Sequence, residues 1–135
     1  MKKITLSILT ITLFFAAACT KEKAVTDNTA PRITISSPTE GQVFMQMTST
    51  DSATLSGNIT DEDLHEFSVL ITNTSGNDTL LNIPGAHQEI NDINISKKFK
   101  LPVVVGTVAF KVIINAEDHS GNVRELVRNF SIEHM

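Results

Sequence analysis

Trp and Tyr are absent from this 135-residue chain, and cysteine occurs once. Binding surfaces often use Trp and Tyr as anchors, so any such surface here has to be built without them. A single cysteine excludes a disulfide within the chain. The catalytic signatures G-x-S-x-G, G-x-x-x-x-G-K-[S/T], G-x-G-x-x-G and H-E-x-x-H are also missing. We therefore predict that the protein is not an enzyme.

Positive charge is scarce. The net charge is −4, and residues 1–18 contain Lys2 and Lys3 but no acid, so the rest of the chain carries −6. Nucleic-acid binding relies on basic patches that neutralise phosphates. We predict no nucleic-acid partner.

Residues 1–18 have the pattern of a secretory signal peptide. Lys2 and Lys3 form a basic start, residues 4–15 are apolar apart from Thr and Ser, and three alanines follow at 16–18. The apolar run is too short to span a bilayer comfortably. We predict export and cleavage after Ala18.

The single cysteine, Cys19, directly follows this cleavage zone. Residues 16–19 resemble a bacterial lipobox, whose cysteine receives a diacylglycerol, although Ala16 stands where that motif prefers Leu. The alternative is ordinary cleavage that leaves a free thiol, which would be a liability in an exported protein. We predict lipidation of Cys19, a polar tether over residues 19–30, and attachment to the outer membrane through the lipid. The periplasmic or surface face is left open.

From residue 31 to 135 apolar residues alternate with period two, and no helical stripe of useful length occurs. The segments 32–36, 52–59, 65–72, 78–83, 90–101, 107–118 and 122–132 are the expected strands. About seven strands in this length predict an all-β domain, an immunoglobulin-like antiparallel β-sandwich. Phe110, Val112 and Ile114 share one face of the clearest strand, and we expect them among the most buried residues.

Three turns are predicted between these strands. Residues 37–41 contain Pro38 and end at Gly41, which we expect to have a positive φ. Ser75-Gly76-Asn77 and Ser120-Gly121-Asn122 are predicted hairpin turns in which Gly and Asn supply the positive φ values.

Three segments carry a resemblance to a known family: DNTAPRITISSPTEGQVF, LSGNITDEDLHEFSVLI and FKVIINAEDHSGNVRELVRNFSI. Over residues 27–133 the chain resembles bacterial immunoglobulin-like modules. More narrowly, it is similar to Bacteroidota lipoproteins of unknown function that begin with A-P-x-I-x-x-x-S-P-x-x-G and end with A-x-D-x-x-G-N. The resemblance implies a fold and a location, and it implies no activity.

Acidic residues recur in three segments that such a sandwich brings to one pole. They are Asp27, Asp61, Asp63 and Asp118. Oxygen ligands from several loops suit Ca²⁺, so one hypothesis is a Ca²⁺ site made by these four residues. The alternative is that they are turn residues whose carboxylates bind their own backbone.

Two further kinds of site are candidates. The four histidines look scattered in the sequence, and His87 is either a metal ligand with Glu89 or an ordinary loop residue. Ser52 and Thr79 follow aspartates and precede apolar residues, a pattern that resembles the acceptor motif for O-glycosylation in Bacteroidota envelope proteins.

Two functions fit these observations. The first is a non-catalytic, lipid-anchored envelope module that binds a protein or another extracytoplasmic ligand through its loops or an open sheet edge. The alternative is a spacer domain with Ca²⁺ at its N-terminal pole. An exposed apolar patch would favour the first, and converging carboxylates would favour the second.

Overall fold

The computed structural model describes residues 27–87 and 91–135. The predicted signal peptide, Cys19 and most of the predicted tether lie outside the described residues. Among the described residues, no helix is long and apolar enough to cross a membrane. The strands of the described part are β1 Arg32–Ser37, β2 Gln42–Gln46, β3 Ser52–Thr60, β4 Leu64–Asn73, β5 Thr79–His87, β6 Asp92–Lys100, β7 Thr107–Asp118 and β8 Val123–His134.

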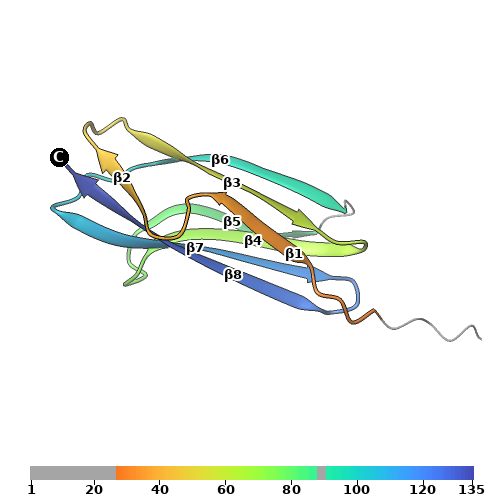
Figure 1. Cartoon of the computed structure of the whole chain (residues 1–135). Helices are drawn as coiled ribbons and strands as arrows, with labels where there is room; N and C mark the ends of the chain where they lie inside the picture. The colour runs from red at the N-terminus through yellow and green to blue at the C-terminus, as the bar shows by residue number, and fades with distance from the viewer. Residues whose placement is uncertain (1–26, 88–90) are drawn as a thin grey trace, which may run out of the picture.

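These strands form two sheets that pack face to face (Figure 1). The smaller sheet has the order β1-β3-β6, and the larger has the order β2-β8-β7-β4-β5. Neighbouring strands are antiparallel except β2 and β8, which are parallel. The first strand, β1, is therefore an edge strand of the smaller sheet, and the next strand, β2, is an edge strand of the larger sheet. This is an immunoglobulin-like β-sandwich, as the sequence predicts.

The inner faces of the two sheets supply one hydrophobic core. Phe110, Val112 and Ile114 on the central strand β7 are at most 1% exposed, so the alternation of this segment predicts its buried face correctly. Phe44, Phe99 and Phe130 pack together with ring centroids 5.6–6.1 Å apart. Aromatic pairs at such distances contribute about 0.5–1.5 kcal/mol each beyond their burial. The other buried apolar residues are Ile33, Ile35, Ala53, Leu55, Ile59, Leu64, Val69, Ile71, Ile95, Leu101, Val104, Ala116 and Ile132.

The sequence prediction misses β2. Val43, Phe44 and Met45 are consecutive apolar residues and show no alternation, yet only Phe44 packs against the core. The β1–β2 turn holds this strand against β8. Glu40 accepts hydrogen bonds from the backbone and side-chain amides of Asn129 (3.1 and 3.0 Å), and the backbone N–H of Gly41 donates to the Asn129 carbonyl (2.9 Å).

The predicted turns form, with one difference. Gly41, Gly76 and Gly121 have φ values of 72°, 77° and 83°. No non-glycine residue of the described part has a positive φ, so the prediction was wrong for Asn77 and Asn122. One glycine is enough in each hairpin because a side chain completes the turn. The Asn73 side chain accepts from the Asn77 backbone N–H (2.9 Å), and Asp118 accepts from that of Asn122 (2.8 Å).

Candidate functional site

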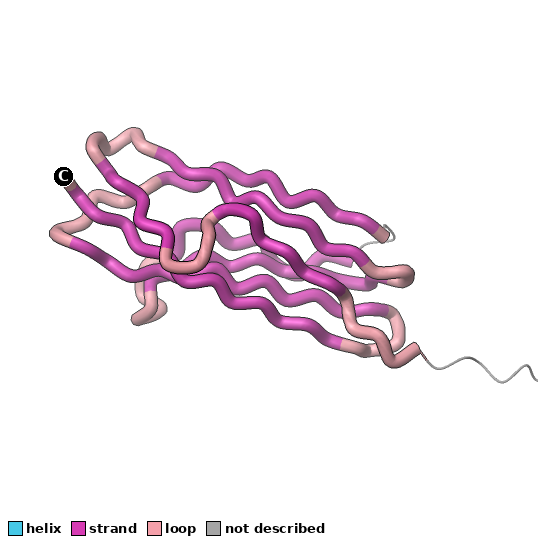
Figure 2. Tube along the Cα trace, viewed as in Figure 1, coloured by secondary structure: helices cyan, strands magenta, loops and turns pink. Residues whose placement is uncertain are grey.

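Because the strands run along one axis, most of the loops gather at two opposite poles, and the β1–β2 turn lies between the poles (Figure 2). We call the end that holds residues 27–30, 61–63 and 119–122 the proximal pole, since the chain arrives there from its N-terminal segment. The distal pole holds residues 47–51, 74–78, 101–106 and the C-terminus. Both poles contain candidate sites.

The three acidic segments meet at the proximal pole, as the topology predicts. The backbone N–H of His119 donates to the Asp63 carbonyl (3.0 Å), which joins the β3–β4 and β7–β8 loops. The Asn122 side-chain amide donates to the Asp27 carbonyl (3.2 Å), which fastens the incoming chain to the same pole. The predicted convergence of these segments is therefore confirmed.

The carboxylate of Asp118 faces the interior of its own turn. It is only 1% exposed, and it accepts hydrogen bonds from the backbone N–H and the side-chain amide of Asn122 (2.8 and 2.7 Å). Burial acts to raise the pKa of Asp118, but the hydrogen bonds from Asn122 and from the backbone of Ser120 and Gly121 outweigh it, so the pKa is lowered. Asp118 is therefore an ionised residue that stabilises the turn.

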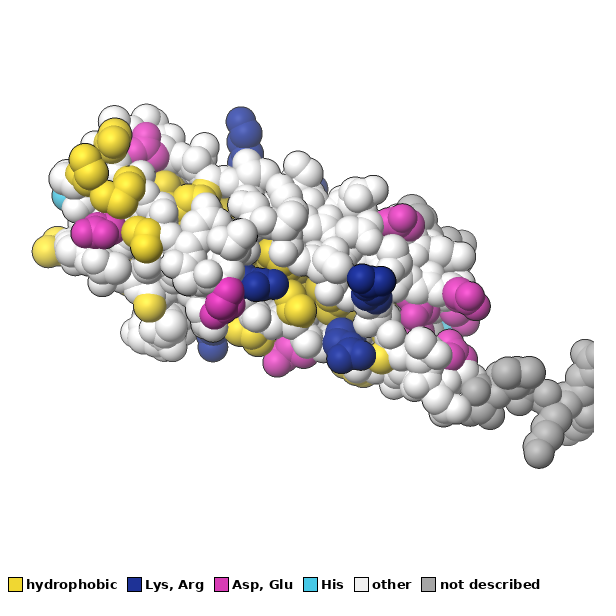
Figure 3. All heavy atoms as spheres, viewed as in Figure 1, with side chains coloured by type: hydrophobic (Ala, Val, Ile, Leu, Met, Phe, Trp, Pro, Cys, Tyr) yellow, Lys and Arg dark blue, Asp and Glu magenta, His cyan; other side chains and the backbone are white. Residues whose placement is uncertain are grey.

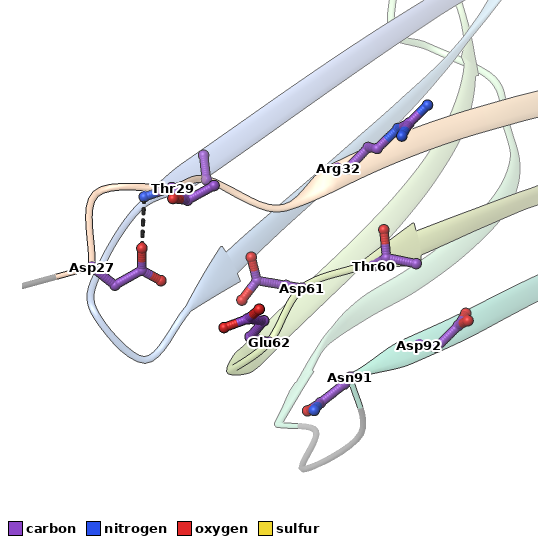
Figure 4. A pocket seen from close by; sticks show the side chains of 9 residues that line it. Asp27, Thr29, Arg32, Thr60, Asp61, Glu62, Asn91 and Asp92 are labelled. Carbon is purple, nitrogen blue, oxygen red and sulfur yellow. Dashed lines mark hydrogen bonds between the residues drawn. The ribbon is translucent and has the colours of Figure 1, made fainter.

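Asp27 and Asp61 line an open groove of ≈ 520 Å³ between the incoming chain and the β3 and β6 ends (Figure 4). Each also caps its own turn, because Asp27 accepts from the Thr29 backbone N–H and Asp61 from that of Asp63 (2.9 Å each). Glu62 and Asp92 add two more carboxylates to the groove lining. The four predicted Ca²⁺ ligands thus share a pole but have separate partners, and Ca²⁺ binding stays a prediction.

A cluster of three histidines lies at the proximal pole. His65, His87 and His119 have ring centroids 4.5–5.5 Å apart, and one ring nitrogen from each lies within 4.8 Å of the others. The Nδ1 atom of His119 is 3.0 Å from the Asp63 carbonyl oxygen and 3.2 Å from the Asp63 carboxylate. The Nδ1 atom of His65 is buried and has no hydrogen-bond partner in the described part of the chain. Among the described residues this is the one group whose side chains lie close enough to share a metal ion.

Three different strands bring these histidines together. His65 is the extra residue of a bulge, since Leu64 pairs with Asp118 and Glu66 pairs with Glu117. His87 ends β5, opposite Glu66, and His119 follows β7. Sequence reasoning missed the cluster because the three residues are far apart in the chain, and the only pattern it offered, His87 with Glu89, involves a residue outside the described part.

Apolar side chains gather at the distal pole, around the C-terminus (Figure 3). We call this group the apolar cap; it consists of Met45, Met47, Val103, Val105 and Met135, which are 41–97% exposed. Two backbone hydrogen bonds of 3.3 Å bring its three segments together: the Met135 N–H donates to the Gln46 carbonyl and the His134 N–H to the Gly106 carbonyl. Met45 of the cap belongs to β2, which is an edge strand of the larger sheet.

The predicted glycosylation residues are at the distal end as well. Ser52 begins β3, Thr79 begins β5, and both are exposed. Thr79 lines a groove of ≈ 280 Å³ together with Leu80, Pro102 and Val103, next to the apolar cap. Glycosylation of either residue stays a prediction.

Comparison with known proteins adds little. No model of a protein family matches the chain, and no curated protein matches it. The chain is similar to a solved structure of murine CRIg, with 7% identity and a TM-score of 0.43 over 79% of this chain and 99% of that chain. This likeness is too distant to indicate a function, and the immunoglobulin-like fold is evident from the strand order of the two sheets. The narrower resemblance to Bacteroidota lipoproteins stays a prediction.

Proposed function

We propose that the chain is a non-catalytic, lipid-anchored module of the bacterial cell envelope that binds a protein partner through the apolar cap. The main support for this proposal is the position of the apolar cap. The cap lies at the distal pole, opposite the end at which the described chain begins (Figure 1), so a chain tethered through its N-terminus would present the cap away from the membrane. The signal peptide at 1–18, lipidation of Cys19 and an outer-membrane location belong to the same proposal.

The chemistry of the cap favours a protein over other ligands. Exposed apolar patches rimmed by polar residues are typical of interaction surfaces, and methionine side chains adapt their shape to a partner. The cap contains no aromatic residue on which a sugar ring could stack. The adjacent edge strand β2 offers backbone groups to which an extended segment of the partner could pair.

The alternative, a spacer stiffened by Ca²⁺, has weaker support. Both oxygens of Asp118 accept hydrogen bonds from Asn122, so binding an ion through this carboxylate would require the turn to rearrange. The Asp63 carboxylate contacts the His119 ring, with a distance of 3.2 Å to Nδ1. A binding module is the better-supported function.

The test compares matched substitutions at the two poles. Val105→Glu places one negative charge on the cap, whereas Val123→Glu places the same charge on an exposed valine near the proximal pole. Surface substitutions of this kind change stability by about 0.5 kcal/mol or less, so the variants should fold alike. Some proteins should co-purify with the wild type from the native membrane. We expect the amount of these proteins recovered with the cap variant to be at least about tenfold lower, which corresponds to a loss of about 1.4 kcal/mol in binding free energy.

The control Val123→Glu should retain the same proteins. Equal recovery with the cap variant and the wild type would exclude the cap as the binding surface. A purified wild-type protein that self-associates, and that the cap variant makes monomeric, would show instead that the cap contacts a second copy of this chain.

A further inference from the structure

We propose that His65, His87 and His119 form a binding site for one late transition-metal ion of the Zn²⁺, Cu²⁺ or Ni²⁺ class. The site lies at the proximal pole, away from the apolar cap, and it is independent of the function proposed above. A cation there would join the β4 bulge, the end of β5 and the β7–β8 turn.

The spacing of the ring nitrogens is close to what an ion requires. At metal–nitrogen distances of about 2.0–2.1 Å, tetrahedral ligand atoms are about 3.4 Å apart. The three nitrogens lie within 4.8 Å of one another, so binding an ion would require the nitrogen–nitrogen distances to shorten by no more than about 1.4 Å. His87 and His119 are exposed, and their side chains have room to make that movement.

The His65 side chain gives a second, independent indication of a ligand at this site. Its Nδ1 atom is buried and has no hydrogen-bond partner among the described residues. A buried polar atom without a partner costs about 1–3 kcal/mol, and a metal ion or a group bound with it would remove that cost. This observation concerns His65 alone and does not depend on the spacing of the cluster.

The contacts of His119 orient its ring for coordination. Its Nδ1 atom faces the carbonyl and carboxylate oxygens of Asp63, so a proton on Nδ1 leaves the lone pair on Nε2. A histidine held in this way by a carboxylate is the usual arrangement around protein-bound metals. Glu66, opposite His87, places a second negative charge beside the cluster.

The donor type selects the class of ion. Imidazole nitrogens suit Zn²⁺, Cu²⁺ and Ni²⁺, whereas Ca²⁺ and Mg²⁺ require oxygen ligands. Three protein ligands leave at least one coordination position for water or another ligand. The site therefore differs in its donor atoms from the Ca²⁺ site predicted from the aspartates, although Asp63 belongs to both.

The test measures metal binding by the full chain in detergent, without a histidine tag. Cys19→Ser is used as the background because any chain that is not lipidated would carry a free thiol at Cys19, which would compete for the same ions. We expect one Zn²⁺ per chain by calorimetry, nitrogen hyperfine structure in the Cu²⁺ electron paramagnetic resonance spectrum, and a higher melting temperature that EDTA reverses. Asp63→Asn should weaken Zn²⁺ binding about 10–100-fold, since Asp63 acts through His119.

Substitutions of the ligands decide the assignment. His87→Gln and His119→Gln should each weaken binding by at least as much as Asp63→Asn, and both residues are exposed, so these variants should fold even where His65→Gln does not. The matched control is His134→Gln, because His134 binds Gln46 at the distal pole and should not affect the ion. Four results would overturn the proposal: absence of stoichiometric binding, unchanged binding in the double variant His87→Gln/His119→Gln, an equal loss in His134→Gln, or displacement of Zn²⁺ by equimolar Ca²⁺.

Discussion

At the scale of single residues, the environment of Asp118 decides its chemistry. A buried carboxylate is costly unless hydrogen bonds satisfy it, and Asn122 supplies them through its backbone and its side chain. Because these bonds lower the pKa of Asp118 below that of the unfolded chain, the unfolded state takes up a proton first on acidification. The contribution of Asp118 is therefore complete above the unfolded pKa of about 3.9 and is lost as the pH falls through the folded pKa.

Asp118→Asn should reveal this contribution. The variant cannot ionise, and it presents an amide to donors that require an acceptor, so we expect it to lose about 1–3 kcal/mol of unfolding free energy at neutral pH. Denaturation followed at several values from about pH 6 to about pH 3 should show a shallower decline for the variant than for the wild type. Asp61→Asn, at the same pole but partly exposed, is the control. Parallel pH profiles for wild type and Asp118→Asn would contradict this role.

The sequence predicts which residues are buried where apolar and polar residues alternate along a strand. It does not predict the position of a side chain whose partners are distant in the chain. The faces of Phe110 and Ile114 follow from period two, because successive side chains of a strand point to opposite sides. The interior position of the Asp118 carboxylate does not follow from any local pattern. Nor does the meeting of His65 with His119, which requires the bulge in β4 and the pairing of β4 with β7.

At the scale of elements, β1 and β3 approach each other closely at Gly57. Gly57 pairs with Ile35, beside a bulge between Ile35 and Ser37. A Cβ atom on Gly57 would lie 2.4 Å from the Thr34 carbonyl oxygen, far inside van der Waals contact. A side chain there would require the backbone of β1 to move away from its sheet.

Gly57→Ala should therefore destabilise the domain by about 1–3 kcal/mol, the usual cost of overpacking. Gly85→Ala is a matched control on β5. Its added methyl group would meet the flexible carboxylate end of Glu66, which can rotate away, so we expect a clearly smaller loss. Chemical denaturation of both variants measures the difference. A loss for Gly57→Ala no greater than that for Gly85→Ala would mean that β1 accommodates the methyl group.

The elements themselves were largely predictable. Seven strands and the convergence of the acidic loops follow from periodicity and from the topology of the fold. The strand that sequence reasoning missed, β2, is short, lacks alternation and depends on the contacts of Glu40 with Asn129. Such tertiary contacts override local pattern, and a single sequence does not display them.

At the scale of the whole molecule, the two poles have different chemistry. The proximal pole gathers carboxylates and histidines around the incoming chain, and the distal pole exposes the apolar cap. An N-terminal anchor would set the proximal pole toward the membrane and leave the cap free for a partner. The orientation proposed for this module therefore depends on how the N-terminus is attached.

We expect Cys19 to carry the lipid that attaches the protein to the membrane. Residues 19–135 carry a net charge of −6, which gives the chain no electrostatic attraction to an anionic bilayer, so stable attachment requires acyl chains. Intact-mass analysis of membrane-derived protein should show a chain that begins at Cys19 and carries acyl groups. Cys19→Ala should move from the detergent phase to the aqueous phase, whereas Thr20→Ala should stay with the wild type. A mature chain with an unmodified Cys19 thiol would contradict the lipid anchor. A Cys19→Ala variant that remains in the detergent phase would contradict it as well. In either case the proposed orientation of the cap, away from the membrane, would no longer follow.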